Sequence, residues 1–488
     1  MLATIMQVID TTIANVALPH MQGSLGATQD QISWVLTSYI VAAAIMTPPT
    51  GWLADRFGRR RLFLVAVAGF TAASMLCGLA GSLDQMVAFR LLQGAFGAAL
   101  VPLSQATLLD SYPRERHGSA MALWGVGIMI GPILGPTLGG YLTETYSWHW
   151  VFFINLPLGL LAMAGIRASV PEGRMERRGF DLFGFALLSL AVGALQMLLD
   201  RGEQQGWFQS TEIAVEAGLA VLALYMFLVH SFTARRPFVD LAMFRDRNFA
   251  VCTLFIFVVG IVLFSTLALL PPFLQTLMDY PVITVGLVLA PRGVGTMISM
   301  MVVGRLLGRV DARPIIVTGL LITAVSLWQM GGFTPEVAMG TIISTGFVQG
   351  IGLGLIFVPL STLAFSTLPP ARRPDATSLF SLSRNIGSSI GISVVISYLT
   401  RNAQIGHAVL AEQVSPYRQA LADLPRAWDL TTVQGIAALN AEVTRQALAI
   451  AYVDDFRLMM VVVLLAIPLI AFIRRPAAAP PAAAAAME

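Results

Sequence analysis

No lysine occurs among the 488 residues of the sequence: all 30 basic residues are arginines. A Walker A loop needs a lysine for the nucleotide phosphates, so this absence excludes a P-loop ATPase. It also excludes chemistry through a lysine Schiff base. The HExxH motif is absent, and no Cys/His cluster has metal-ligand spacing. We therefore expect no metal, no cofactor and no enzyme activity, and the energy for any work would come from an ion gradient.

Charge and cysteine are also scarce. Charged residues make up 12% of the chain, whereas soluble domains carry about 25%. Hydrophobic residues make up 56%, and the mean hydropathy is +0.75. The two cysteines, Cys77 and Cys252, lie inside apolar runs, so no disulfide framework is expected. This composition is typical of a polytopic membrane protein, and no nucleic-acid partner is expected.

Apolar runs long enough to cross a bilayer recur along the chain. A membrane-spanning helix needs about 20 such residues. Fourteen runs qualify, at residues 2–20, 31–53, 62–81, 85–109, 118–142, 150–168, 181–199, 212–232, 250–274, 281–304, 314–332, 337–366, 376–400 and 456–473. The sequence therefore predicts an all-α membrane protein with 14 transmembrane helices.

Most arginines fall in loops on one side of the predicted bundle, which the positive-inside rule assigns to the cytoplasm. Both chain termini are therefore predicted to be cytoplasmic. The first helix begins at Met1 with no basic residue before it, so we expect the native protein to start further upstream. An intact-mass measurement of the natively expressed protein tests that expectation.

The second part of the chain repeats the first. "QGAFGAALVPLS", which begins at Gln93, matches "QGIGLGLIFVPLS", which begins at Gln349, at an offset of 256 residues. Gly131 and Gly387 match at the same offset. Chance similarity between apolar segments is the alternative, but it does not by itself align Gln-Gly and Pro-Leu-Ser. Parallel repeats of this kind are found in the major facilitator architecture.

The repeat predicts the domain organisation. We expect two like-oriented halves of six helices at 1–170 and 236–475, with two additional helices between them at 171–235. The segment 402–455 is predicted to be a long, polar periplasmic loop that contains helix-forming stretches. The tail at 476–488 is of low complexity and is predicted to be disordered.

The motif "GWLADRFGRRRL" joins the second and third predicted helices. Gly51 allows close helix approach and Gly58 allows a tight turn, while Asp55 and the arginines can pair across the cytoplasmic face. A basic loop that only sets topology is the alternative. The spacing resembles the signature loop of the major facilitator superfamily, which acts as a conformational latch. The resemblance implies that role for Gly51, Asp55, Arg56, Gly58, Arg59 and Arg60.

Glycine recurs every fourth residue in the fifth predicted helix, "GVGIMIGPILGPTLGG". Such a stripe lets another helix approach closely, and proline can kink the helix. Plain helix packing is the alternative. The pattern resembles the antiporter motif of drug:proton exchangers, which lies between the two halves of those proteins. The residues of this glycine motif are Gly127, Gly131, Pro132, Gly135, Pro136 and Gly139.

Two charged residues are predicted to meet inside the membrane. Asp10 interrupts the apolar run "ATIMQVIDTTIANVALP" at a cost of roughly 2.5–3.5 kcal/mol on insertion scales. Asp10 and Arg90 lie about 13 Å and about 9 Å below the outer ends of their helices, so their side chains can reach similar depths. Burial favours a protonated carboxyl group and a nearby arginine favours the ionised one, which predicts a proton-coupling pair. The alternatives are an Asp10 bonded to Thr11, Thr12 or Asn15, and an Arg90 bonded to backbone carbonyls.

Essentially the whole chain resembles the fourteen-helix drug:proton antiporters of the EmrB/QacA type. "SWHWVFFINLPLG" and "LAPRGVGTM" contribute to the match, as does R-x-x-Q-G at Arg90, which in that family is linked to proton transfer. The long outer segment is most similar to the EmrB branch. The resemblance implies a proton-coupled multidrug efflux transporter of the bacterial inner membrane. It would export amphipathic or aromatic small molecules through a membrane-fusion adaptor protein and an outer-membrane channel.

Other readings stay open on the sequence alone. A dedicated exporter of one metabolite or siderophore fits the same features, and a polytopic enzyme or a channel fits them less well. Two further intramembrane arginines either contact an anionic substrate or bond backbone carbonyls. The candidate residues of a substrate cavity are Thr11, Thr37, Gln93, Arg292 and Arg384.

Overall fold

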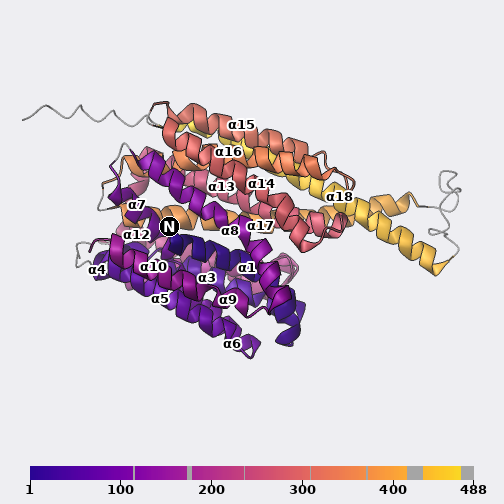
Figure 1. Ribbon diagram of the computed structural model, residues 1–488, viewed down its shortest axis with the longest axis horizontal. Coiled ribbons are helices and arrows are strands. Elements are labelled where there is room, and N and C mark those ends of the chain that lie inside the picture. The colour runs from indigo at the N-terminus through magenta and orange to yellow at the C-terminus, as the bar shows by residue number, and fades with distance from the viewer. Residues whose placement is uncertain are drawn as a thin grey trace, which may run out of the picture.

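The computed structural model describes residues 1–113, 116–172, 179–235, 237–307, 309–369, 372–414 and 432–473, and these are almost entirely helical (Figure 1). The tail at 476–488 and the middle of the predicted outer loop lie outside these ranges. So do several arginines used for the predicted orientation, namely Arg114, Arg174, Arg177, Arg178, Arg236, Arg474 and Arg475.

The first six predicted spans form the first half. Its elements are α1 (Leu2–Ser24), α2 (Gln29–Ile32), α3 (Trp34–Met46), α4 (Thr50–Phe57), α5 (Arg59–Gly78), α6 (Leu83–Gly97), α7 (Leu100–Ser111), α8 (His117–Thr145), α9 (Trp150–Phe153) and α10 (Asn155–Ser169). The two additional helices are α11 (Leu182–Arg201) and α12 (Thr211–Thr233), with a 3-10 turn η2 (Trp207–Gln209) between them.

The second half follows after a 3-10 turn, η3 (Leu241–Arg245). Its elements are α13 (Arg247–Pro272), the π-helical η4 (Phe273–Leu277), α14 (Val282–Leu306), α15 (Ala312–Met330), α16 (Met339–Ser366), α17 (Arg373–Glu412), α18 (Val433–Ala466) and the 3-10 segment η8 (Ile467–Phe472). Each predicted span therefore coincides with helix.

Thirteen helices of the described residues are long and apolar enough to cross a membrane. The remaining predicted span, 31–53, is divided into α2, α3 and α4. Pro48 and Pro49 explain the break between α3 and α4, because proline has no N–H to donate and its ring clashes with the preceding turn. Together these helices give the predicted all-α membrane protein.

The two halves form two layers, with α8 and α17 close to where they meet (Figure 1). The seam between the halves, meaning here the packing of α8 against α14, is antiparallel and close. A Cβ atom added at Gly125 would lie 2.6 Å from the Met300 sulfur, and one at Gly304 would lie 2.6 Å from the Ala122 Cβ. Small residues on both helices therefore let the two backbones approach each other.

The additional helices pack where the first half meets the second. The side chain of Gln196, on α11, accepts a hydrogen bond from Ser389 of α17 at 2.8 Å. On the other side of α11, Gly193 lies against Ile45 of α3. Helix α11 therefore joins the two halves from the side.

Within the predicted loop at 402–455, the described residues 402–412 and 433–455 are helical. Helix α17 continues to Glu412 and α18 begins at Val433, so both extend beyond the rest of the bundle as a helical hairpin (Figure 1). His407 and Asn440 are hydrogen-bonded across this hairpin at 3.0 Å. The stretches of helix formers seen in the sequence are continuations of the two membrane helices.

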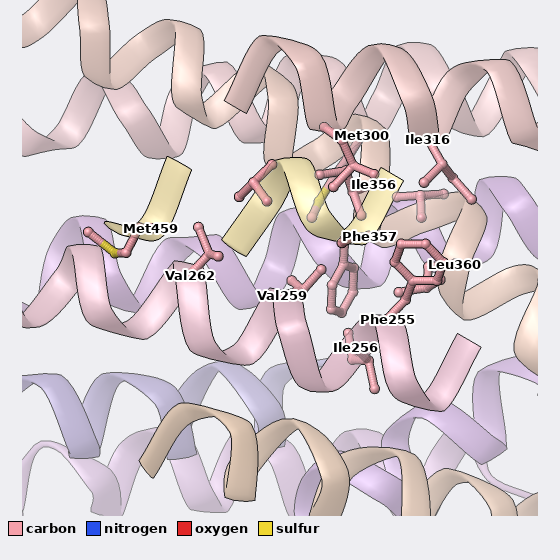
Figure 2. Packing of buried hydrophobic residues seen from close by; sticks show 14 of the residues in the cluster. Phe255, Ile256, Val259, Val262, Met300, Ile316, Ile356, Phe357, Leu360 and Met459 are labelled. Carbon is pink, nitrogen blue, oxygen red and sulfur yellow. The ribbon is translucent and has the colours of Figure 1, made fainter. Parts of the chain in front are cut away.

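Aromatic and aliphatic side chains from several helices fill the second half. Phe255, Val259 and Val262 of α13 lie beside Phe357 of α16 and Met459 of α18 (Figure 2). These residues are all fully or nearly fully buried. Such packing holds the helices that carry the second half's intramembrane arginines.

The same close helix crossing occurs in each half. In the first half, Gly94 of α6 lies against the carbonyl oxygen of Tyr39 on α3, and an added Cβ would overlap that oxygen. In the second half, Gly350 of α16 lies in the same way against the carbonyl oxygen of Arg292 on α14. Gly94 and Gly350 are 256 residues apart, so the repeat seen in the sequence is also present in the helix packing.

Gly94→Ala should lower the free energy of unfolding by about 1–3 kcal/mol, because the neighbouring atom belongs to the backbone and cannot rotate away. The matched control is Gly218→Ala on α12, where nothing lies within 4 Å of an added Cβ. Thermal unfolding in detergent measures both. Equal melting temperatures for the two variants would contradict the close crossing.

Candidate proton-coupling site

Asp10 lies in the middle of α1 and is completely buried, with 0% of its surface exposed. Arg90 and Gln93 approach it from α6, where their spacing of three residues puts them on the same helix face. Both are as deeply buried, at 1% and 0% exposed. The pairing of Asp10 with Arg90 that the helix depths predict is therefore confirmed.

Both oxygens of the Asp10 carboxylate accept hydrogen bonds. The Nη1 atom of Arg90 donates to Oδ2 at 2.9 Å. The side-chain amides of Gln93 and Asn155 donate to Oδ1 at 2.8 Å and 2.6 Å. A buried carboxylate needs such partners, because its desolvation would otherwise cost several kcal/mol.

Arg90 is also held by groups other than Asp10. Its Nε atom donates to the carbonyl of Val35 at 3.0 Å, and its Nη1 atom donates to Gln93 Oε1 at 2.7 Å. The guanidinium carbon lies 4.4 Å from the ring centre of Tyr39, which is a cation–π distance. Arg90 thus bonds a backbone carbonyl as well as Asp10, and its role in proton coupling stays a prediction.

Two of the three alternative partners proposed for Asp10 are engaged elsewhere. The hydroxyls of Thr11 and Thr12 both donate to the carbonyl of Val8 at 2.9 Å. Asn155, on α10, is a functional candidate that the sequence reasoning missed. It is completely buried, and its amide also donates to Ser74 of α5 at 2.9 Å. The available signal was a lone asparagine inside the apolar stretch "VFFINLPLG".

The second half contains a neutral version of this network. At the offset of 256 residues, Thr266 of α13 corresponds to Asp10 and Gln349 of α16 corresponds to Gln93. The Gln349 amide donates to the Thr266 hydroxyl at 3.4 Å, so the contact between these positions is repeated. Gly346 occupies the position of Arg90. The scaffold is therefore shared, and only the first half has the ion pair.

The latch motif brings together both halves at the face where α4 and α7 end. Gly58 has φ +87°, a left-handed conformation that favours glycine. Arg59 pairs at 2.5 Å with Asp110, at the end of α7, and Asp110 also pairs at 2.8 Å with Arg373 of α17. Asp110, which the sequence reasoning did not identify, thus links the motif to the second half. The sequence feature that could have identified Asp110 is its place as an acidic residue at the end of a helix on the arginine-rich side.

The other latch residues support the same contact. Gly51 lies directly against Asp375 of α17, where an added Cβ would overlap the carboxylate. Arg60 donates to the backbone carbonyl of Arg167 at 2.7 Å, which ties the motif to the end of α10. Arg56 is exposed.

The glycine motif of α8 packs against α1, within the first half. Gly131 lies against Val8 and Gly135 against Thr12, whereas Gly139 would place a Cβ 3.3 Å from Ile13. This placement corrects the expectation that the stripe lies between the two halves. The seam is formed instead by another face of α8, which includes Gly118 and Gly125. The sequence did not distinguish the two faces because glycines occur on both.

The candidate cavity residues are not gathered at one place. Gln93 belongs to the Asp10 network, and Thr37 is buried with its hydroxyl bonded to Asp200 of α11. Arg292 and Arg384 lie in the second half, on α14 and α17. A shared substrate cavity formed by these residues therefore stays a prediction.

The geometry allows one chemical event above all. The Asp10 carboxylate is neutralised by Arg90 in this conformation. If the helices move apart, the carboxylate loses its counter-ion, so the pairing of Asp10 with Arg90 depends on the packing between helices.

Comparisons with known proteins agree with this arrangement. Residues 1–392 match the Major Facilitator Superfamily. The chain is 38% identical over 463 residues to multidrug export protein EmrB of Escherichia coli strain K12, covering 93% of this chain and 90% of that protein. It is 35% identical over 474 residues to the fatty acid resistance protein FarB of Neisseria gonorrhoeae, covering 96% and 94%. The solved proton:xylose symporter XylE shares the fold, with a TM-score of 0.60 at 15% identity and coverage of 94% and 92%.

Replacing Arg90 by glutamine should lower the free energy of unfolding by about 3–5 kcal/mol, because it leaves the Asp10 carboxylate buried without its counter-ion. Adding Asp10→Asn to that variant removes the unpaired charge and should recover most of the loss. Thermal unfolding of the single and double variants measures this coupling. Additive effects of the two substitutions would show that the pair does not stabilise the fold as one unit.

Proposed function

The chain belongs to the major facilitator superfamily and is a multi-pass membrane protein, and on that premise we propose that it is a proton-coupled multidrug efflux transporter. It exchanges protons for amphipathic or aromatic molecules across the bacterial inner membrane, with its arginine-rich face in the cytoplasm. The observation that carries the proposal is the buried ion pair between Asp10 and Arg90. Charged residues at such depth are characteristic of proton relays in transporters.

Helix α8 couples the proton site to the movement of the two halves. One face of α8 packs against α1 on both sides of Asp10, through Gly131 at Val8 and Gly135 at Thr12. Its other face packs against α14 of the second half, through Gly125 at Met300. A change at the seam therefore displaces the turn that carries Asp10, and the resulting change in the contact with Arg90 binds or releases the proton.

Contacts of Asp110 with Arg59 and Arg373 hold the arginine-rich face closed in this conformation. Opening this face to the cytoplasm breaks the pair with Arg373, which joins the two halves. The latch thereby keeps the substrate path from being open to both sides at once, as alternating access requires.

Asp10→Asn should still insert in the membrane, since Arg90 keeps its bonds to Val35 and Gln93, but it should lose gradient-driven export, because the amide cannot bind and release a proton. Asp10→Glu should keep part of the activity, since it retains the carboxyl group. The measurement is substrate movement in proteoliposomes under an imposed pH difference.

The matched control is Asp84→Asn, which neutralises an exposed aspartate at the start of α6. That variant should export at the wild-type rate. Export by Asp10→Asn at the wild-type rate under the same gradient would overturn the assignment of Asp10.

The hairpin formed by the ends of α17 and α18 provides a contact for a membrane-fusion adaptor protein, which passes the substrate to an outer-membrane channel. It extends beyond the bundle and presents exposed apolar side chains, among them Val409 and Val433, which are 54% and 84% exposed. Packing of the hairpin on its own outer face is the alternative.

Removing residues 408–439 and joining the chain at the pair of His407 and Asn440 should weaken co-purification of a co-expressed adaptor. Proton exchange by the same variant in vesicles should be unchanged, because the truncation leaves the ion-pair network intact. Val409→Ser with Val433→Ser serves as the milder variant that keeps the backbone. Unchanged adaptor recovery with both variants would rule out the hairpin as the docking element.

A further inference from the structure

Two arginines of the second half lie inside predicted membrane spans, and neither forms an ion pair with a described residue. Arg292 is only 6% exposed. Its Nη2 atom donates to the carbonyl of Leu263 at 3.4 Å, and its Nη1 atom is buried without a partner in the described part of the chain. This guanidinium group is therefore far less satisfied than that of Arg90.

Arg384 of α17 is only partly buried, but its guanidinium group is also poorly satisfied. Its Nη2 atom reaches only the side chain of its neighbour Asn385, at 3.4 Å, and its buried Nε atom has no partner among the described residues. Arg384 is on the same helix face as Thr377 and Arg373, at spacings of seven and eleven residues. Arg373 contacts the end of α7 in the first half, whereas Gly391, seven residues beyond Arg384, packs against Ile261 of α13 in the second half.

Both arginines lie near adjacent turns of α13. Arg292 reaches Leu263 from α14. The backbone of Arg384 lies against Gly260, one turn earlier, where an added Cβ would overlap the Arg384 carbonyl. Asp455, a buried carboxylate of the second half, lies on α18 and pairs with neither.

The internal repeat shows that the fold does not require a charged residue at the position of Arg292. Arg292 makes the crossing contact with Gly350 that Tyr39 makes with Gly94, so Arg292 replaces a neutral residue. At Gly346, which occupies the position of Arg90, an added Cβ would lie 3.7 Å from the Arg292 Cβ, at ordinary van der Waals contact. The second half therefore has an arginine, Arg292, at the position of the neutral Tyr39. It has Thr266 at the position of the Asp10 carboxylate.

A buried guanidinium with unused N–H groups is costly unless an anion or further acceptors satisfy it. Planar guanidinium groups bind carboxylates and sulfonates through paired N–H donors. The adjacent residue Gly293 packs against Ile133 of α8, so Arg292 lies at the seam between the halves. It becomes accessible to a ligand when that seam opens.

We propose that Arg292 and Arg384 bind the anionic group of transported substrates, which gives this protein a selectivity for amphipathic aromatic anions. The inference rests on the proposed export function, because it names the substrate class of that same protein. The Asp10 pair handles the proton in the first half, and the two arginines hold the negative charge of the substrate in the second.

Three probes with one ring system separate charge from shape: 2-naphthoate, its neutral amide 2-naphthamide, and 2-naphthylmethylammonium. Binding of each is measured to the full chain in phosphatidylcholine nanodiscs, which contain no anionic lipid. Arg292→Gln and Arg384→Gln should each raise the Kd of naphthoate by about tenfold or more, as expected for loss of a charge-assisted hydrogen bond. Their Kd values for the amide should stay unchanged, and Arg292→Lys should recover part of the naphthoate binding.

The matched control is Arg457→Gln on α18, where the arginine is 61% exposed and pairs with Asp454. It should leave binding of all three probes unaltered. Equal losses for the three probes in the Arg292 and Arg384 variants would overturn the proposal and assign these arginines a structural role. The proposal would also be overturned if the wild-type protein bound naphthoate no more tightly than the amide.

Two further arms separate the remaining explanations. If phosphatidylglycerol competes with naphthoate in wild type and not in the arginine variants, the occupant is a lipid headgroup and the substrate assignment is wrong. Charge-selective naphthoate binding without gradient-driven export of any probe would leave the anion site standing and overturn the proposed function. Gradient-driven export of the cation with no naphthoate binding would overturn the anion site and leave the proposed function standing.

Discussion

A buried ion pair sets the arrangement of the first half. Asp10 and Arg90 come from different helices and have almost no access to water, so each depends on the other and on the amides of Gln93 and Asn155. An isolated charge at this depth would cost several kcal/mol. The ion pair and its hydrogen bonds therefore favour the observed relative positions of α1, α6 and α10. Any motion that separates these helices breaks the contacts that neutralise Asp10.

The two halves share one scaffold and differ in charge. The contact of Gln93 with Asp10 recurs as the contact of Gln349 with Thr266, and the close helix crossing at Gly94 recurs at Gly350. The first half uses this scaffold for a neutralised acid–base pair. In the second half, Arg292 and Arg384 form no ion pair with a described residue. Because α8 contacts both α1 and α14, a single conformational change would link the proposed proton site in one half to the proposed anion site in the other.

The sequence predicted the fold well because hydropathy, arginine bias and a repeated offset depend on local composition. It also predicted that Asp10 and Arg90 meet, since a fixed rise per residue converts sequence position into depth. It did not predict which helix face meets which neighbour, so Gln93 was assigned to a cavity and Asn155 was missed. Rotation about a helix axis depends on packing between distant segments, and the apolar faces of α8 and α10 are too similar in composition to indicate it.

Difference infrared spectroscopy of the Asp10 carboxyl group tests the central claim most directly. Spectra of wild type and Asp10→Asn are compared as the buffer is changed from mildly alkaline to mildly acidic, with the protein in nanodiscs. If Asp10 carries the coupled proton, wild type gains a carboxylic acid C=O band that the variant lacks, and adding substrate removes that band. A carboxylate that stays ionised throughout, with identical difference spectra for the two proteins, would contradict the claim.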